Sequence, residues 1–239
     1  MPKSKGQQPQ AGSQTLARGL RALIAVVDSA DGMTVQGMAN ELGVHRTIAY
    51  RLLQTLASFG FVTQGSDGVY RPGARLAALA DTYLPALREA AFPSMRKVAD
   101  EVGCTVSLYV AEPDAAVSIA LVEPTPETFH VRFPVGMRTP IDRGAAAYAL
   151  LAAGPALPGE PDAVAKARSR GYATSHGEII EGAYAVAAPI IGASPRSCLN
   201  LITYREDQAK SAEKHILHAA EMISKALLTP HPMKESEIV

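Results

Sequence analysis

Cysteine is scarce in this chain: Cys104 and Cys198 are the only two among 239 residues. Neither belongs to a CxxC or Cys/His pattern, which argues against a disulfide framework or a structural zinc site and favours two buried, reduced thiols. Long apolar runs are also absent, since no stretch approaches the roughly 18 residues of a transmembrane helix. Lys3 and Lys5 are not followed by the apolar run of a secretory signal. These absences predict a soluble, cytoplasmic protein with no membrane partner.

Catalytic and cofactor motifs are missing as well. The chain has no GxSxG, HExxH, P-loop or GxGxxG pattern. Ser175 and His176 are adjacent, which usually points two side chains apart rather than pairing a nucleophile with its base. His215 and His218 have i, i+3 spacing but no further ligand near them. We therefore expect no enzyme, no metal site and no cofactor.

Net charge is zero, yet the charge is unevenly distributed. Residues 1–75 contain eight Lys and Arg residues against four acidic ones, a net charge of +4, so the remainder carries −4. The asymmetry favours a polyanion contact in the N-terminal part and another role for the rest. Chance variation of the surface is the alternative.

The stretch from Thr34 to Tyr70 has the pattern of two helices, a tight turn and a hairpin. One helix ends at Gly43, and a second, starting near Arg46, ends at Gly60. Strand-like segments at 61–63 and 69–71 flank a loop of turn residues. An earlier amphipathic helix is marked by Leu16, Leu20, Leu23, Ile24 and Val27, and the expected core of the helix pair is Met38, Leu42, Ile48, Leu52 and Leu56. The pattern predicts a winged helix-turn-helix over residues 14–74, preceded by a disordered tail at 1–13.

The second helix of the pair suits insertion into a DNA major groove, because polar residues occupy its outer face. Arg46 and Thr47 lie where base contacts concentrate, and Arg can bind a guanine edge through two hydrogen bonds. The full predicted DNA-binding set is Arg18, Thr34, His45, Arg46, Thr47, Tyr50, Arg51, Gln54 and Arg71. Arg18 and Arg71 are expected to contact phosphates rather than bases.

Several alternatives stay open for this stretch. Arg51 could form an ion pair with Glu41, Tyr50 could pack in part, and the whole element could serve protein contacts instead of DNA. Thr34 is a suitable N-cap for the first helix of the pair. The second lacks an evident one, since Val44 and His45 precede it, and Thr47 could take that role one turn late.

The remaining chain predicts an α+β domain with a mostly antiparallel sheet at 91–229. A linker helix at 75–90, kinked or divided by Pro85, leads into it. Strands are expected at 105–110, 117–122, 129–133, 184–191 and 198–204, and helices at 92–102, 145–153, 163–170 and 212–227. Residues 230–239 are predicted to be a disordered tail.

The loop at 135–144 leads directly into an alanine-rich helix. Small residues at a helix start expose backbone N–H groups, which, with the helix dipole, favour a carboxylate or phosphate. The loop therefore predicts the anion-recognising end of a small-molecule pocket, with Asp142 as a possible helix cap. A helix packed flat on a sheet is the alternative.

An ordered set of short motifs resembles the isocitrate lyase regulator (IclR) family of bacterial transcription factors. The motifs are Leu-Ala-Arg-Gly-Leu at 16–20, Leu-Gly-Val-His-Arg-Thr-Ile-Ala-Tyr-Arg-Leu-Leu at 42–53, Gly-Phe-Val at 60–62, Tyr-Arg-Pro-Gly at 70–73, Val-Gly-Met-Arg-Thr-Pro-Ile at 135–141, Ala-Tyr-Ala-Leu-Leu-Ala at 147–152, Arg-Gly-Tyr-Ala at 170–173 and Ala-Val-Ala-Ala-Pro-Ile at 185–190. Each motif is weak alone, but their order and spacing over residues 14–228 are specific.

The resemblance implies a winged helix-turn-helix, a linker helix and a GAF-like effector-binding domain. It also implies a homodimer or a tetramer that is a dimer of dimers, double-stranded operator DNA as partner, and control of catabolic genes by a small organic acid, aromatic acids included. Carried over by position, the effector pocket comprises Thr128, Val131, Thr139, Ala145, Ala146, Ser175, Ala183 and Ala185. The other interpretation is a small-molecule-binding or catalytic GAF-like protein whose N-terminal domain mediates dimerisation.

The chain departs from the family pattern around this pocket. Ala147-Tyr148 replaces a common Gly-Lys, Ser175 takes a place that is often acidic, and Ala185 one that is often larger. Residues 153–163 form a shortened segment. These departures predict a roomier, less charged pocket for an apolar or aromatic effector.

Overall fold

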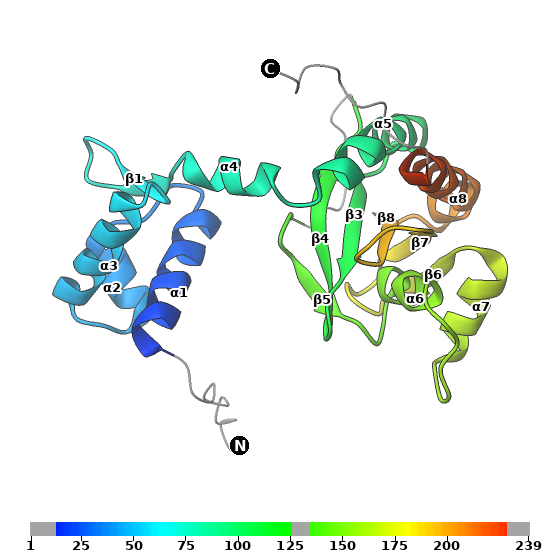
Figure 1. Cartoon of the computed structure of the whole chain (residues 1–239), viewed down its shortest axis with the longest axis horizontal. Coiled ribbons are helices and arrows are strands. Elements are labelled where there is room, and N and C mark those ends of the chain that lie inside the picture. Colours follow the sequence, from blue (N-terminus) through cyan, green and yellow to red (C-terminus); the bar gives the residue numbers. More distant parts are fainter. Residues whose placement is uncertain (1–12, 126–133, 229–239) are drawn as a thin grey trace, which may run out of the picture. The chain divides into compact units, whose positions relative to one another are not determined.

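The computed structural model describes residues 13–125 and 134–228, which divide into two compact units between Tyr83 and Leu84 (Figure 1). The predicted strand at 129–133 and the predicted effector residues Thr128 and Val131 lie outside the described residues.

The first unit contains the predicted helices and hairpin. Its elements are α1 (Gln14–Asp28), α2 (Val35–Leu42), α3 (Arg46–Ser58), β1 (Val62–Gln64), β2 (Tyr70–Pro72) and α4 (Arg75–Asp81). Gly43 ends α2 in the left-handed conformation, with φ at 61°, as a helix-terminating glycine does. The strands of the hairpin lie one residue later than predicted. The winged helix-turn-helix architecture is confirmed.

Both helices of the pair have side-chain caps at their N-termini. Thr34 Oγ1 accepts a hydrogen bond from Gly37 N at 3.0 Å, as predicted. For α3 the cap is His45, whose Nδ1 accepts from Thr47 N at 3.3 Å. The expectation of a missing cap was therefore wrong, because an imidazole nitrogen supplies the acceptor that Ser, Thr or Asp supplies elsewhere.

The core of the first unit is smaller than the periodicity predicted. It consists of Ala22, Val26, Met38, Ala39, Ala49, Leu53, Val62 and Tyr70. Leu42, Leu52 and Leu56 are only partly buried, and Ile48, predicted as core, is 41% exposed. Apolar residues occupy two sides of α1 and α3, and periodicity alone does not tell which side the chain covers.

On α1 most of the predicted apolar stripe lies on the side of the helix that faces solvent. Leu16, Leu20, Ile24 and Val27 are 49–63% exposed, while Ala22 and Val26 pack inward. Only Leu23 of the predicted stripe packs against the core. Four large apolar side chains on one helix therefore face solvent within the described first unit.

The hairpin is tied to the helices through Tyr70. Its backbone pairs with Met33, through N···O distances of 2.8 and 2.9 Å, and its buried phenol oxygen accepts from Gln54 Nε2 at 2.8 Å. Gly32, with φ at 81°, permits this close approach, since a Cβ atom there would lie 2.7 Å from Tyr70 O. The wing and α3 consequently form one rigid piece.

The predicted linker helix at 75–90 is divided at Pro85, which was one of the two predicted outcomes. Helix α4 ends at Asp81, Leu84 adopts a left-handed φ of 49°, and Pro85 begins α5 (Pro85–Val102). Proline disfavours a helical residue before it and suits the first position of a helix, so Pro85 starts a helix instead of kinking one.

The second unit is built on one antiparallel sheet in the order β5-β4-β3-β8-β7-β6. Its elements after α5 are β3 (Val106–Ala111), β4 (Ala115–Val122), β5 (Arg138–Pro140), α6 (Ala145–Ala152), α7 (Asp162–Arg170), β6 (Ala173–His176), β7 (Tyr184–Ile190), β8 (Ser197–Thr203) and α8 (Glu206–Leu228). The sequence did not predict β5 or β6, because such short edge strands carry little periodicity and depend on their neighbours. The α+β class is confirmed.

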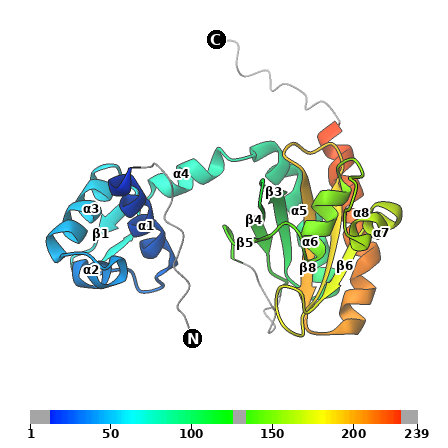
Figure 2. The ribbon, with the colours of Figure 1, turned by 90° about the horizontal axis from the view of Figure 1, so that it is seen from below.

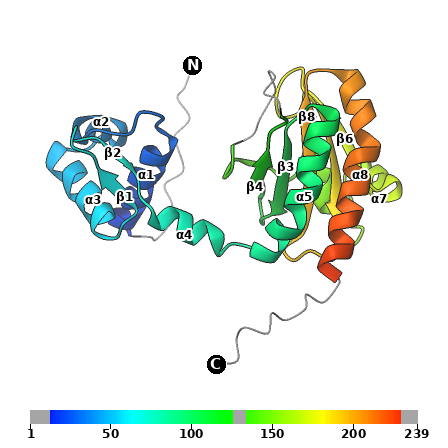
Figure 3. The same cartoon turned by 90° about the horizontal axis from the view of Figure 1, so that it is seen from above.

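Helices cover both faces of this sheet. Figure 3 shows α5 and α8 side by side over one face, and Figure 2 shows α6 over the other. The second unit has two hydrophobic clusters, one on each face of the sheet, and β8 contributes to both. Its residues Leu199 and Leu201 pack toward α5 and α8, whereas Cys198 and Ile202 belong to the cluster with α6. Asn200 lies between those two, on the side of α6. Both cysteines are free and buried.

Candidate nucleic-acid interface and ligand pocket

The outer face of α3 presents four of the predicted DNA-binding side chains. Arg46, Thr47, Tyr50 and Arg51 are exposed. Within the described residues neither arginine forms an ion pair, so the alternative of an Arg51–Glu41 pair is not realised. Two guanidinium groups are thus free for a ligand in the first six positions of the helix.

Three other predicted DNA-binding residues have structural partners. Gln54 is half-buried and donates to Tyr70, Thr34 caps α2, and His45 caps α3 and lies 3.2 Å from Thr47 Oγ1. Sequence periodicity placed Gln54 on the outer face, but the wing packs against that part of α3. These side chains position the helices.

The wing carries an ion pair that the sequence analysis did not predict. Arg71 Nη2 lies 2.8 Å from Asp67 Oδ2, Arg71 Nη1 lies 3.2 Å from Oδ1, and Val69 N donates to Asp67 at 3.0 Å. The Arg71 guanidinium and this N–H group lower the pKa of Asp67 to about 2. The stabilisation from this pair is present above the unfolded pKa of 3.8 and is lost as the pH falls through about 2. Arg71 is thus paired at neutral pH, whereas Arg18 on α1 is exposed.

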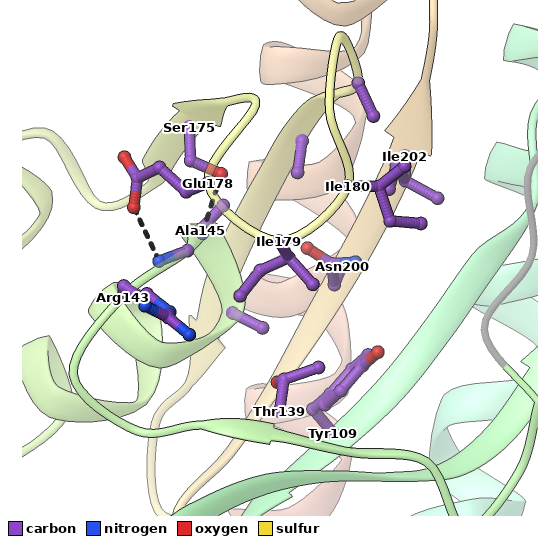
Figure 4. Close-up of a pocket in the computed structure, with 14 residues that line it drawn as sticks. Tyr109, Thr139, Arg143, Ala145, Ser175, Glu178, Ile179, Ile180, Asn200 and Ile202 are labelled. Carbon is purple, nitrogen blue, oxygen red and sulfur yellow. Dashed lines mark hydrogen bonds between the residues drawn. The ribbon is translucent and has the colours of Figure 1, made fainter. Parts of the chain in front are cut away.

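The predicted effector residues that the structure describes converge on one pocket beside the start of α6 (Figure 4). Thr139, Ala145, Ala146, Ser175, Ala183 and Ala185 all line it. Six further lining residues were not predicted from the sequence: Tyr109, Glu178, Ile179, Ile180, Asn200 and Ile202. Arg143 and Gly144 belong to the predicted loop at 135–144, but neither was named as a pocket residue. Asn200 could have been noticed in the sequence, because it is a polar residue within an apolar strand. The loop at 177–182 has no pattern that predicts its position in the pocket.

The N–H groups at the start of α6 already have acceptors. Gly144 N donates to Glu178 Oε2 at 2.8 Å, and Ala145 N donates to Ser175 Oγ at 3.0 Å. The Tyr148 hydroxyl donates to the same Glu178 oxygen at 2.7 Å. Burial, together with this carboxylate, raises the pKa of Tyr148 to about 12. Asp142 does not cap the helix, because Gly144 is the N-cap residue.

The pocket is narrow in this conformation. Its free volume is about 20 Å³, which is room for one water molecule. Ile179 and Ile180 reach into it from the loop between β6 and β7 (Figure 4), and a Cβ atom at Gly144 would lie 2.8 Å from Ile179 Cγ1. The roomier pocket expected from the small residues is therefore not present, because this loop fills the space that they leave.

Two polar groups in the pocket lack partners among the described residues. Asn200 is only 3% exposed, and its Oδ1 accepts no hydrogen bond there. Arg143 is exposed and forms no ion pair within residues 13–125 and 134–228. A buried amide oxygen without a donor costs free energy, so the pocket offers one unsatisfied acceptor and one cation to a guest molecule.

The described residues contain no group of three or more His, Cys, Asp and Glu side chains placed to hold a metal ion. They also contain no helix long and apolar enough to cross a membrane.

The fold and the two sites define the class of two-unit regulators with a winged helix-turn-helix before a ligand-binding domain. Residues 15–66 match the model of the IclR helix-turn-helix domain, and residues 84–158 match that of the bacterial transcriptional regulator IclR C-terminal domain. The chain belongs to the IclR family of transcriptional regulators.

Two relatives that match part of this chain are named as repressors. The chain is 29% identical over 134 residues to the DNA-binding transcriptional repressor YiaJ of Escherichia coli, covering 55% of this chain and 48% of that one. It is 27% identical over 164 residues to the transcriptional repressor IclR of the same organism, covering 64% and 60%. The match thus spans less than two thirds of either relative.

Solved structures share the fold. An IclR homolog from Microbacterium hydrocarbonoxydans, complexed with 4-hydroxybenzoate, superposes with a TM-score of 0.74 at 22% identity, covering 90% of this chain and 99% of that one. The IclR of Thermotoga maritima superposes with a TM-score of 0.70 at 22% identity and the same coverage.

Proposed function

We propose that this protein is a non-catalytic, ligand-responsive transcriptional regulator that binds operator DNA through α3 and its wing, and a small organic acid in the pocket beside α6. The observation that carries the proposal is the pair of unpaired arginines, Arg46 and Arg51, on the exposed face of a capped recognition helix. Such a helix enters a major groove with its N-terminal residues on the base edges. An effector would act by binding one arrangement of the DNA units more tightly than another.

A gel-retardation assay with the DNA upstream of the protein's own gene tests this proposal. We expect a complex at low salt that resists excess unrelated DNA and weakens steeply as salt rises. The same assay with added organic acids should change the affinity. Absence of any complex at low salt would instead favour a ligand-binding protein whose first unit only mediates dimerisation.

We propose that the DNA-binding form is a homodimer, alone or paired into a tetramer, held in part through α1. The support is the exposed stripe of Leu16, Leu20, Ile24 and Val27. Contiguous apolar patches of this kind on a soluble protein mark interaction sites. A second copy of the same helix is self-complementary to it about a two-fold axis, which also suits a palindromic operator.

An organic acid is the effector class that the pocket chemistry favours. Arg143 supplies a cation, Asn200 supplies an acceptor without a partner among the described residues, and the alanines and isoleucines supply apolar surface. The 4-hydroxybenzoate bound by the Microbacterium homolog combines a carboxylate with an apolar ring and a hydroxyl donor. A molecule of this chemistry, with its donor toward Asn200, would satisfy each group.

Arg143→Ala is expected to weaken binding of 4-hydroxybenzoate by about 10- to 150-fold, because a hydrogen-bonded charge contributes about 1.5–3 kcal/mol. Calorimetry on the full chain measures this loss. The affinity of Arg143→Lys should lie between those of the natural protein and Arg143→Ala, because lysine keeps the positive charge but lacks the planar guanidinium group. An equal loss for the uncharged 4-hydroxybenzamide would show that Arg143 does not recognise the carboxylate.

Asp67→Asn is expected to tighten DNA binding. The change frees Arg71, exposed beside the wing, for a phosphate, and one more phosphate contact steepens the slope of log affinity against log salt by about 0.9. Fluorescence anisotropy with labelled operator across a salt series measures both effects. Glu41→Gln is the matched control: it makes the same charge change at an exposed position of α2 with no arginine partner in the described chain. Equal slopes for the two variants would contradict a phosphate contact by Arg71.

A further inference from the structure

The loop between β6 and β7 places a carboxylate and apolar side chains in the pocket at the same time. Glu178 accepts hydrogen bonds from the Gly144 N–H group and the Tyr148 hydroxyl. Ile179 and Ile180 line the pocket beyond it (Figure 4). A carboxylate joined to an apolar body is also the chemistry of the proposed effector. We infer that Glu178 is an internal competitor for the effector's carboxylate, so that an acid binds at α6 only by displacing it; this inference rests on the proposed function.

The free volume of the pocket requires such a displacement. About 20 Å³ holds one water molecule but no organic acid. The Gly144 N–H group, the donor nearest the helix start, is already bonded at 2.8 Å. A guest acid can therefore bind the Gly144 N–H group, and can fit in the pocket, only when the loop moves away.

The pocket has a feature of a ligand site that the loop leaves unused. Asn200 is 3% exposed and lines the pocket, yet its Oδ1 has no donor among the described residues. If the loop were simply core packing, this buried acceptor would be expected to have a partner. The loop therefore supplies a carboxylate to the Gly144 N–H group but no hydrogen-bond donor to Asn200 Oδ1.

The loop is also able to leave the pocket. Glu178 is exposed, so its carboxylate can return to water without being buried elsewhere. Gly177 and Gly182, which bracket the segment, have φ of 70° and 73°. Glycine tolerates both signs of φ, so these positions can absorb a change of path. Displacement then exchanges one carboxylate for another, and the charge of the site stays constant.

Calorimetry on the full-length protein tests the competition. The probes are two acids, benzoate and isobutyrate, each compared with its neutral amide. In Glu178→Ala we expect the acids to bind at least about tenfold more tightly than in the natural protein, because the fraction of open sites no longer limits the apparent affinity. Glu178→Gln, which keeps an acceptor without the charge, should show a smaller gain. Glu181→Ala, an exposed glutamate in the same loop, should show none.

The comparison of acids with amides separates competition from simple gating. Loss of a steric gate would tighten acids and amides equally, and this result would overturn the inference. Unchanged acid binding in Glu178→Ala, or failure of that variant to bind either acid, would overturn it too. The amide resonance of Gly144 gives a second measurement: it should shift in Glu178→Ala and move back toward its original position when benzoate is added.

Gel retardation with the same variants keeps the two proposals apart. If the natural protein binds its upstream DNA and responds to an acid while Glu178→Ala behaves identically, the regulator stands and the competition fails. If no variant binds DNA although Glu178→Ala gains acid affinity, the competition stands and the regulatory role fails.

Discussion

Replacing Leu20 and Ile24 together by glutamate is expected to abolish specific DNA binding while leaving the chain folded. Both side chains are more than half exposed on α1, so the unit loses no core contact. In a dimer, however, the four new carboxylates would meet across the two-fold axis, where burying like charges is strongly unfavourable. A monomer reads only one half-site, so we expect the affinity for operator to fall by at least about 100-fold, toward non-specific binding.

Analytical ultracentrifugation and anisotropy with labelled operator measure the two effects separately. Leu157→Glu is the matched control, because Leu157 is 60% exposed in the second unit and lies far along the chain from α1. It should change neither the mass of the particle nor the DNA affinity. A double α1 variant that sedimented like the natural protein and bound operator normally would show that α1 is not the dimer contact.

The same residues show how far the sequence could specify the first unit. Turn glycines, the Thr34 cap and the spacing of apolar residues predicted α2, α3 and both hairpin strands to within about two residues, whereas the end of α4 at Asp81 was not predicted. The covered side of α1 and α3 was not predictable, because Leu20 and Ile48 have the right period for either side. Burial depends on which neighbour packs against the helix, and that is decided by tertiary contacts such as Gln54 with Tyr70.

In the second unit the positions carried over from the family pattern line one pocket, whereas the loop that fills this pocket was not predicted. The start of α6 and the small residues around it were identified from short motifs. Glu178 and Ile179 lie in a loop without periodicity, and their contact with Gly144 spans 34 residues of sequence. The small side chains around the pocket suggested a roomy site. The sequence did not show that the loop between β6 and β7 fills the space beside them.

Arg46→Ala is expected to lower operator affinity by about 1–3 kcal/mol for each half-site, and to relax the preference at one base pair. The side chain is exposed at the first position of α3, immediately after the cap, and forms no ion pair in the described chain, so its loss should not unfold the unit. A two-fold dimer presents it twice, which doubles the effect on the complete site. Anisotropy with the operator and a set of single-base variants measures affinity and preference together.

Two further variants serve as comparisons for Arg46→Ala. Arg18→Ala, at the predicted phosphate contact on α1, should weaken binding to every sequence alike and reduce the salt slope by about 1 for each half-site. Arg170→Ala, an exposed arginine at the end of α7, should do neither. Base readout and charge attraction differ in this respect: only the first depends on the sequence bound. If Arg46→Ala weakened all sequences equally, as Arg18→Ala should, Arg46 would be a phosphate contact, and Thr47, Tyr50 and Arg51 would remain as the candidate base readers.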